Sequence, residues 1–255
     1  MLWSMKELHG VTIGATDGDI GTVQDCYFDD LSYTVRYLVV DTGGWLASRQ
    51  VLLSPIAVRQ LDWATKRLTA ALTKAQVKNS PNIDTEKPVS RQHETAYYGY
   101  YGYTPYWAGD YLWGTYPYPY LGTGPNAADL AREQRWNWEA KEREDPHLRS
   151  ARAVTGYHIH ATDGAIGHVE DYLVDAQSWA IRYMVVDTTN WWAGQKVLVA
   201  PAWIQRVDWA ASQVHVTLTR AQIKTSPPYD PARPIERAYE TRLYDHYGHP
   251  RYWGE

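Results

Sequence analysis

Short apolar runs separated by turn residues recur along two stretches of the chain, and this pattern predicts β-strands. Asp17-Gly18 and Asp163-Gly164 each stand between two such runs, which indicates a tight hairpin where glycine supplies the positive φ. The run 35–41 is apolar at odd and even positions, which predicts a strand buried on both faces. Five or six strands in about 65 residues, with turns about every 8–12, indicate a small barrel.

A short helix is expected to close each set of strands. Thr73 with Gln76, and Thr219 with Gln222, fit the capping box that begins a helix. Pro81 follows in the first set and is expected to end that helix.

The two strand-rich stretches are copies of one pattern. At an offset of 146 residues, positions 10–107 align without a gap with positions 156–253, and 43 of these 98 pairs are identical. The block RYLVVDT that begins at Arg36, for example, matches RYMVVDT beginning at Arg182. Gap-free register over this length indicates duplication of one structural unit.

The region between the copies has a different composition. Residues 97–121 hold 10 Tyr, 2 Trp, 3 Pro and 4 Gly without a helical or strand period, which predicts an irregular segment. Residues 126–145 have a mostly charged pattern that predicts a helix, with Asn126 as its N-cap and Pro146 as its stop.

The tyrosine-rich segment is partly repeated after the second copy. Arg91 and Glu94 recur as Arg237 and Glu240, and several aromatic residues keep the same register. A random linker has no reason to keep side chains in register, so each copy is expected to carry an extended, tyrosine-rich arm that docks on a barrel. A flexible linker that binds a partner through its aromatic rings is the alternative.

Composition excludes several classes of protein. The 255 residues carry a net charge of -4, which argues against a generic nucleic-acid coat. Cys26 is the single cysteine, so no internal disulfide or four-cysteine metal site is possible. No run of about 18 apolar residues and no basic-then-apolar leader occurs, so the expectation is a cytoplasmic protein without direct membrane insertion.

The ordered blocks DG-x-IG-x-V-x-D, [VI]RY[LM]VVD and V-L-[LV]-x-P, followed by a closing helix with Ser-Pro, resemble the PRC-barrel family. The resemblance covers residues 2–83 and again 150–229. The family includes the cytoplasmic domain of the photosynthetic reaction-centre H subunit and the C-terminal domain of a ribosome-maturation factor. The resemblance implies a small, curved β-barrel used for protein or ribonucleoprotein contacts, without catalysis.

The expected fold is therefore mainly β, with two PRC-type barrels in tandem that form an internal pseudo-dimer. Each barrel is followed by a short helix and a tyrosine-rich arm. The expected divisions are a first barrel, an arm with a linker helix, a second barrel and a C-terminal arm, at residues 1–90, 91–149, 150–235 and 236–255.

Repeated acidic residues are expected to have structural roles in turns and at strand ends rather than roles in acid–base chemistry. The pairs are Asp17 with Asp163, Asp25 with Asp171, Asp29 with Asp175, and Asp41 with Asp187.

Histidines and the cysteine offer a second set of candidates. His158 and His160 share one face of a strand, and His168 reaches that face only if a bulge shifts the register. These residues carry no carboxylate or thiolate at motif spacing, so we expect solvated histidines and no metal site. Cys26 is expected to be a small core residue. No catalytic motif is present, so neither enzymatic activity nor a cofactor is expected.

Aromatic residues are the main candidates for contact with a partner. Trp45 and Trp191 favour a lid over a barrel end, with an exposed contact as the alternative, and Trp192 is the better exposed candidate. Trp63 and Trp209 are expected in the core. The full set of interaction candidates is Trp45, Trp191, Trp192, Tyr106, Trp107, Tyr252 and Trp253.

The sequence therefore predicts a non-enzymatic protein-interaction or scaffold module with an unidentified protein partner. Association with a ribonucleoprotein is one alternative, which requires a local basic patch. Peripheral association with a membrane electron-transfer complex is another.

Overall fold

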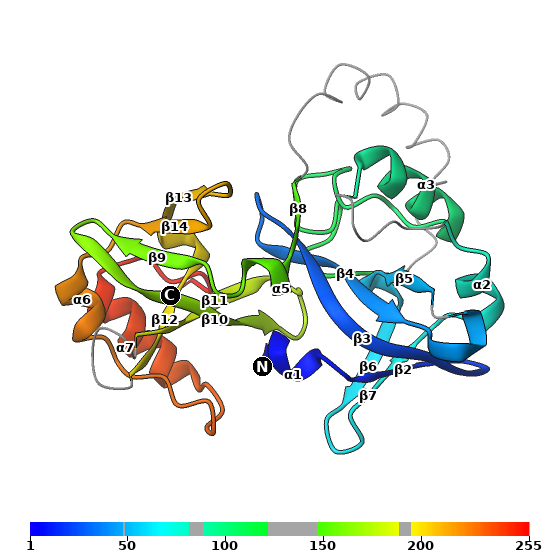
Figure 1. The fold of residues 1–255 in the computed structure, drawn as a ribbon, viewed down its shortest axis with the longest axis horizontal. Helices are drawn as coiled ribbons and strands as arrows, with labels where there is room; N and C mark the ends of the chain where they lie inside the picture. Colours follow the sequence, from blue (N-terminus) through cyan, green and yellow to red (C-terminus); the bar gives the residue numbers. More distant parts are fainter. Residues whose placement is uncertain (48, 82–88, 122–146, 189–194, 255) are drawn as a thin grey trace. The chain divides into compact units, whose positions relative to one another are not determined.

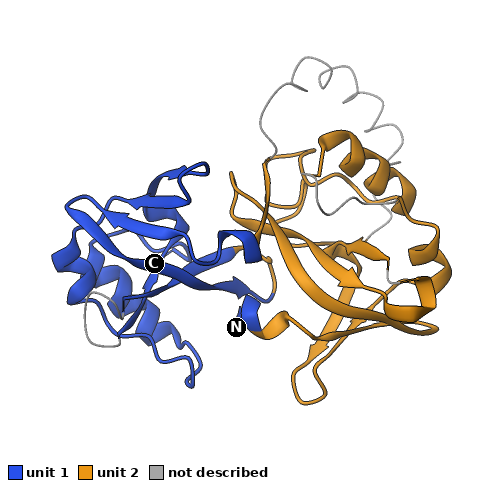
Figure 2. Ribbon diagram, viewed as in Figure 1, with its two compact units in different colours: residues 1–6, 152–176, 181–255 blue, residues 7–151, 177–180 orange. Residues whose placement is uncertain are grey.

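The fold is given by a computed structural model that describes residues 1–47, 49–81, 89–121, 147–188 and 195–254 (Figure 1). The helix expected over 126–145 lies outside the described residues. The chain divides into two compact units (Figure 2). Unit 1 contains residues 1–6, 152–176 and 181–255, and unit 2 contains residues 7–151 and 177–180.

Unit 2 is built on a sheet of seven strands in the order β5-β4-β3-β2-β7-β6, with β8 added on β3. The strands are β2 (Thr12–Ala15), β3 (Gly18–Asp29), β4 (Thr34–Asp41), β5 (Gln50–Leu53), β6 (Val58–Asp62), β7 (Arg67–Ala70) and β8 (Leu148–Ser150).

Unit 1 has a sheet of the same order, β12-β11-β10-β9-β14-β13, with β1 added on β10. The strands are β1 (Leu2–Ser4), β9 (His158–Ala161), β10 (Gly164–Asp175), β11 (Ile181–Asp187), β12 (Lys196–Val199), β13 (Ile204–Asp208) and β14 (Gln213–Val216).

The mainly β fold is confirmed, but the sheets are not closed barrels. In unit 2 the hydrogen-bonded path ends at β5 on one side and β6 on the other. A 3-10 turn, η2 (Pro55–Ala57), separates these two strands, and the equivalent turn η3 (Pro201–Trp203) separates β12 from β13. Proline at the start of each turn lacks an N–H for a ladder, so the chain leaves the sheet there.

The core of each unit includes the strand next to one end of its sheet, β4 in unit 2 and β11 in unit 1. In β4, every residue from Thr34 to Val40 is buried, as the two-sided apolar pattern predicts. β3 bulges beside Gly21, because Ile13 faces Gly21 while Gly14 faces Asp19, which leaves one extra residue on β3. A Cβ atom at Gly21 would clash with the carbonyl oxygen of Asp41, so only glycine fits this bend.

Short helices frame each sheet. Both capping boxes are confirmed at the start of α2 (Lys74–Lys78) and α6 (Arg220–Lys224). The remaining helical elements are α1 (Met5–Leu8), η1 (Gly43–Leu46), α3 (Arg91–Tyr101), α5 (Ala151–Val154) and α7 (Arg237–Tyr247).

The arms are not extended segments at their start, which corrects the sequence-based expectation. Residues 91–101 form helix α3, which Ser90 caps through its side chain and which Gly102 ends at φ 67°. The equivalent helix α7 ends at Gly248 with φ 68°. Tyr97 and Tyr101, four positions apart on α3, have ring centroids 4.8 Å apart, and Tyr97 and Tyr98 are buried, so this tyrosine-rich helix has a packed side.

The compact units do not follow the two repeats residue for residue. Residues 91–121 belong to unit 2 together with the first set of strands, and 236–255 belong to unit 1. Residues 1–6 belong to unit 1 and residues 177–180 to unit 2, so each unit includes a piece of the other repeat.

Candidate functional site

The arm of unit 2 is fixed by a buried carboxylate, Glu94 on α3. Its Oε1 accepts hydrogen bonds from the hydroxyls of Tyr37 at 3.0 Å and Tyr106 at 2.8 Å. Its Oε2 lies 3.0 Å from the Arg91 guanidinium and 3.3 Å from Nε2 of His147. We call these five residues the Glu94 cluster. Because Glu94 is fully buried, its charge requires these partners.

The same arrangement recurs in unit 1 around Glu240 of α7. Its Oε1 accepts from Tyr183 and Tyr252, each at 2.8 Å, and its Oε2 lies 2.8 Å from Arg237. The four residues form the Glu240 cluster. In both units the carboxylate of the arm helix therefore accepts hydrogen bonds from one tyrosine on β4 or β11 and from one tyrosine of the arm itself.

An arginine on β4 or β11 covers the ring of the arm tyrosine. The Arg36 guanidinium lies 3.7 Å from the ring centroid of Tyr106, and Arg182 lies 4.2 Å from that of Tyr252. Arg36 is buried and also pairs with Asp29 at 3.3 Å. Each contact adds cation–π attraction to the hydrogen bonds of its cluster.

Burial changes the acidity of the tyrosines in these clusters. Desolvation, together with the nearby charge of Glu94, raises the pKa of Tyr37 and of Tyr106 well above the ordinary value. In unit 1, burial raises the pKa of Tyr252 to about 12. These hydroxyls therefore stay protonated at neutral pH and remain donors to the carboxylate.

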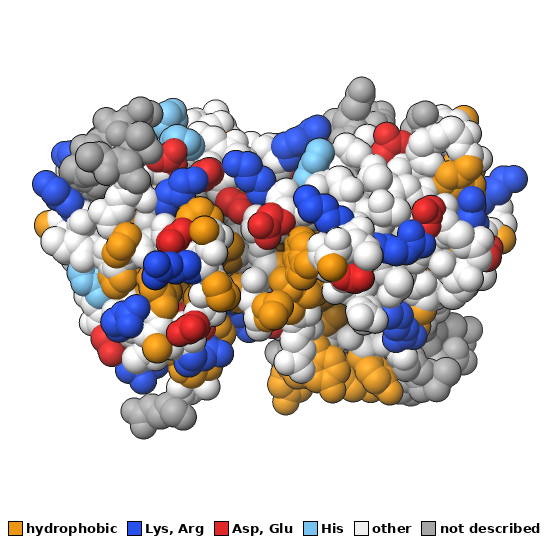
Figure 3. All heavy atoms as spheres, turned by 90° about the horizontal axis from the view of Figure 1, so that it is seen from below, with side chains coloured by type: hydrophobic (Ala, Val, Ile, Leu, Met, Phe, Trp, Pro, Cys, Tyr) orange, Lys and Arg blue, Asp and Glu red, His pale blue; other side chains and the backbone are white. Residues whose placement is uncertain are grey.

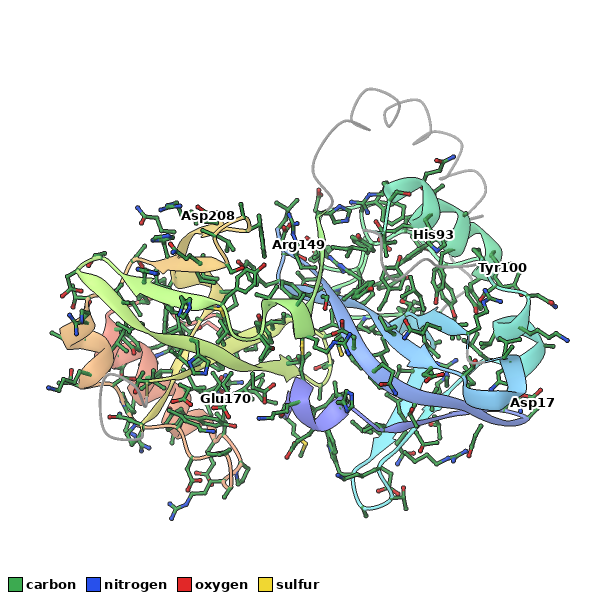
Figure 4. All side chains as sticks on the ribbon, viewed as in Figure 1. Asp17, His93, Tyr100, Arg149, Glu170 and Asp208 are labelled. Atoms are coloured by element: carbon green, nitrogen blue, oxygen red, sulfur yellow. The ribbon has the colours of Figure 1, made fainter. Side chains whose placement is uncertain are left out.

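Aromatic packing continues along α3 and into the segment that follows. Tyr97 packs edge-on against Tyr37, with centroids 5.2 Å apart, and its hydroxyl accepts from the backbone N–H of Ser54. Tyr98 and Tyr103 are also buried. Tyr100 is on the outer side of the helix (Figure 4), where its hydroxyl donates to the carbonyl of Gln76 at 2.8 Å. The first part of the arm is a packed part of unit 2.

The second part of the arm turns its rings outward. We call Tyr111, Tyr116, Tyr118 and Tyr120 the tyrosine surface. Tyr111, Tyr118 and Tyr120 are 61%, 39% and 50% exposed, and the Tyr116 ring lies 4.6 Å from that of Tyr120. Exposed rings grouped in one short segment are typical of a contact surface.

Trp113 holds this surface to unit 2. Its side chain is buried, and its Nε1 donates to the carbonyl of Ser178 at 2.7 Å. Arg36 donates to the carbonyl of Leu112 beside it. The backbone is braced by bonds from Tyr111 N–H to Gly114 and from Trp113 N–H to Tyr116. The exposed rings are thus carried on an ordered, anchored loop.

Sequence reasoning did not single out Tyr111, Tyr118 or Tyr120 as candidate contacts. The available signal was the run Tyr-Pro-Tyr-Pro-Tyr from Tyr116 to Tyr120. Two prolines within five residues exclude a helix and a central strand, so the intervening rings have few ways to be buried.

Several of the predicted contact residues have internal roles instead. Tyr106 is buried in the Glu94 cluster, where its hydroxyl donates to Glu94. Trp107 is half-buried, and its ring centroid lies 5.1 Å from that of Tyr98. The guanidinium of Arg91 lies over the Trp107 ring, 4.4 Å from the ring centroid. In unit 1, Tyr252 belongs to the Glu240 cluster. The guanidinium of Arg237 lies 4.2 Å from the ring centroid of Trp253.

The predicted tryptophan contacts differ in how far the structure describes them. Trp45 is half-buried in η1, and its Nε1 donates to the carbonyl of Ile20 on β3. Trp191 and Trp192 lie outside the described residues. Trp63 and Trp209 are half-buried, which corrects their expected place in the core, because both follow β-strands at the turns before β7 and β14.

The repeated acidic residues accept hydrogen bonds from backbone or side-chain groups. Asp17, at the hairpin tip beside α2 (Figure 4), accepts from the N–H of Lys74 at 2.8 Å. Asp29 accepts from Leu31 N–H at 2.9 Å, and Asp41 from Gly43 N–H at 2.9 Å. These are turn and cap contacts, as the sequence pattern predicts.

The histidines of the second repeat share one face of the unit 1 sheet. A bulge between Ala165 and Gly167 puts His168 directly opposite His158, and the rings of His160 and His215 stack with centroids 5.1 Å apart. β9, which carries His158 and His160, lies between β10 and β14. Across the described part of the chain, no group of three or more His, Cys, Asp or Glu side chains is placed to hold a metal ion.

Cys26 is buried on β3, in the core position that its apolar neighbours predict. Desolvation by burial, with the charges of Arg206 and His160, lowers the pKa of His215.

On the face shown in Figure 3, charged side chains of both signs are interspersed, and hydrophobic side chains gather into contiguous areas. No helix among the described residues is long and apolar enough to cross a membrane.

Comparison with known proteins supports the family resemblance over part of the chain. Residues 7–77 match the family model described as PRC-barrel domain. A protein of Deinococcus radiodurans described as "Uncharacterized protein" is 32% identical over 90 residues, which are 35% of this chain and 32% of that protein. The chain thus matches about a third of the length of this curated relative.

Proposed function

We propose that this chain is a non-enzymatic interaction module that binds a protein partner through the tyrosine surface of unit 2. The observation that carries the proposal is the exposure of Tyr111, Tyr118 and Tyr120 on a loop that the buried Trp113 anchors. Tyrosine suits this role because it offers a large, rigid ring at a small loss of conformational entropy, with a hydroxyl for hydrogen bonding.

The match of residues 7–77 to the PRC-barrel domain supports this class of function, because the resemblance implies contact with other macromolecules. On this proposal the two repeats have diverged arms, and unit 2 carries the contact residues. Ribonucleoprotein association and contact with a membrane electron-transfer complex are alternative partners of the same surface.

The test compares affinity capture by the wild-type chain and by a Tyr111→Ser/Tyr118→Ser/Tyr120→Ser variant. Leu31→Ser is the matched control, because Leu31 is an apolar side chain of unit 2 that is 84% exposed. A partner retained by wild type and by Leu31→Ser, but lost by the triple variant, supports the proposal. A partner that the triple variant retains overturns it, provided that both variants keep the wild-type melting temperature.

Nuclease and mild detergent arms distinguish the alternatives. Loss of the partner after nuclease treatment, with binding that weakens as salt rises, favours a ribonucleoprotein. Release of a membrane-protein partner only in detergent favours a membrane complex.

A further inference from the structure

Each sheet is completed by a strand from the other repeat. β1 of the first repeat pairs antiparallel with β10, with Leu2 opposite Asp175. β8 of the second repeat pairs antiparallel with β3, with Leu148 opposite Asp29. The registers are equivalent at the 146-residue offset, so the same exchange is present twice in one chain.

An aspartate side chain on each strand that receives the added strand, β10 or β3, accepts hydrogen bonds from that added strand. The Ser4 hydroxyl donates to the carboxylate of Asp171, and the Lys6 N–H donates to the same carboxylate at 3.0 Å. In unit 2 the Ser150 hydroxyl donates to Asp25. These contacts give Asp25 and Asp171 a structural role, which hairpin and turn chemistry does not explain for this pair.

Backbone bonds extend the recognition beyond the three paired residues. The N–H of Ala176 donates to the carbonyl of Met1 at 2.9 Å, and the N–H of Asp30 donates to the carbonyl of His147 at 2.9 Å. Arg149 adds an ion pair to Asp30 at 2.7 Å. Figure 4 shows Arg149 on β8 and Glu170 on β10.

Both added strands have the sequence Leu-x-Ser and are followed at once by a short helix. α1 follows β1, and α5 follows β8. The boundary between the units falls within each of these helices, between residues 6 and 7 and between residues 151 and 152. The chain therefore leaves one unit and enters the other within one helical turn of the added strand.

We propose that β3 and β10 carry strand-acceptor sites for an extended Leu-x-Ser segment, and that a second copy of this chain supplies that segment. A second copy presents the same strand with the same hydrogen-bonding groups. Only the higher effective concentration within one chain favours the intrachain pairing. The product is a strand-exchanged dimer in which each acceptor keeps every contact described above.

The test uses the full chain with Cys26→Ala as background and single cysteines at a paired position. One chain carries Leu2→Cys and a second, differently tagged chain carries Asp175→Cys, which leaves Ser4 and Asp171 in place. The two chains are mixed at high concentration, unfolded and refolded together, and oxidised. A disulfide between them forms efficiently only if β1 of one chain lies on β10 of the other.

The control mixture pairs Leu2→Cys with Ala64→Cys, an exposed turn residue of unit 2 that measures random collision. The expected result is several-fold more interchain disulfide with Asp175→Cys than with Ala64→Cys, and a dimer by light scattering. One chain with both Leu2→Cys and Asp175→Cys reports the intrachain pairing. An intrachain disulfide without interchain product above the control overturns the proposal, and so does the absence of both.

Discussion

The Tyr37 hydroxyl donates to the Glu94 carboxylate at 3.0 Å, and the residues 146 positions later, Tyr183 and Glu240, repeat this bond at 2.8 Å. The tyrosines are on β4 and β11, and the glutamates are on the arm helices α3 and α7. The bond therefore couples the sheet to the arm, and its recurrence explains why the arm keeps register with its repeat.

Glu94→Gln is expected to destabilise unit 2 by about 2 kcal/mol, because it removes a buried charge and leaves Arg91 without its counter-ion. Denaturant unfolding of the full chain measures the change. Asp230→Asn is the control, since its pair with Arg233 is exposed and is expected to contribute less than about 0.5 kcal/mol. Equal effects of the two substitutions would contradict the proposed coupling.

The chain is expected to lose stability at alkaline pH as its buried tyrosines ionise. Burial raises the pKa of Tyr37, Tyr97 and Tyr106 well above 10.0 in the folded state. Their stabilising contribution is therefore complete below the unfolded-state pKa and declines as pH rises above about 10. Tyrosinate absorbance and circular dichroism measured together check this. A component that ionises only as the fold is lost is expected, whereas full ionisation of all tyrosines in the folded chain would contradict it.

Asp171 is expected to give a dependence on pH of the same sign in the acidic range. Burial raises its pKa above 3.8 in the folded state, against the smaller effect of its bonds from Ser4 and Tyr172. Ionisation of the Asp171 carboxyl therefore lowers the free energy of unfolding at pH values above its folded-state pKa. This loss disappears as the pH falls from the folded-state pKa towards the unfolded-state pKa. The free energy of unfolding of wild type, relative to Asp171→Asn, should rise as pH is lowered from 7 to 4. A difference that is constant or falls would show that the hydrogen bonds dominate.

Two glycine-to-alanine substitutions are expected to act in opposite directions. Gly21→Ala puts a methyl group against the carbonyl of Asp41 and should destabilise the chain by about 1–3 kcal/mol. Gly99→Ala, within α3, meets no atom within 4 Å and should stabilise it by about 0.5–1 kcal/mol. Thermal unfolding of both variants gives the signs, and destabilisation by Gly99→Ala would be inconsistent with a helix there.

Local chemistry made much of this protein predictable from its sequence. Three kinds of element depend only on neighbours a few residues apart. They are the hairpin at Asp17-Gly18, the capping boxes at Thr73 and Thr219, and the buried strand before Asp41. The register of the two copies was visible because one offset aligns them without a gap. The role of tyrosine in the arm was only partly predictable, because composition indicated many rings but not which of them are buried.

The tertiary structure alone decided which repeat completes each sheet. Ser4 and Ser150 belong to the same short motif, and Asp25 and Asp171 are equivalent acceptors, so the sequence permits pairing within a repeat as well as between repeats. The same holds for Glu94, whose carboxylate is buried only because Tyr37, Tyr106 and His147, distant in sequence, converge on it. A sequence specifies the groups that can pair, whereas the choice among equivalent partners depends on the path of the whole chain.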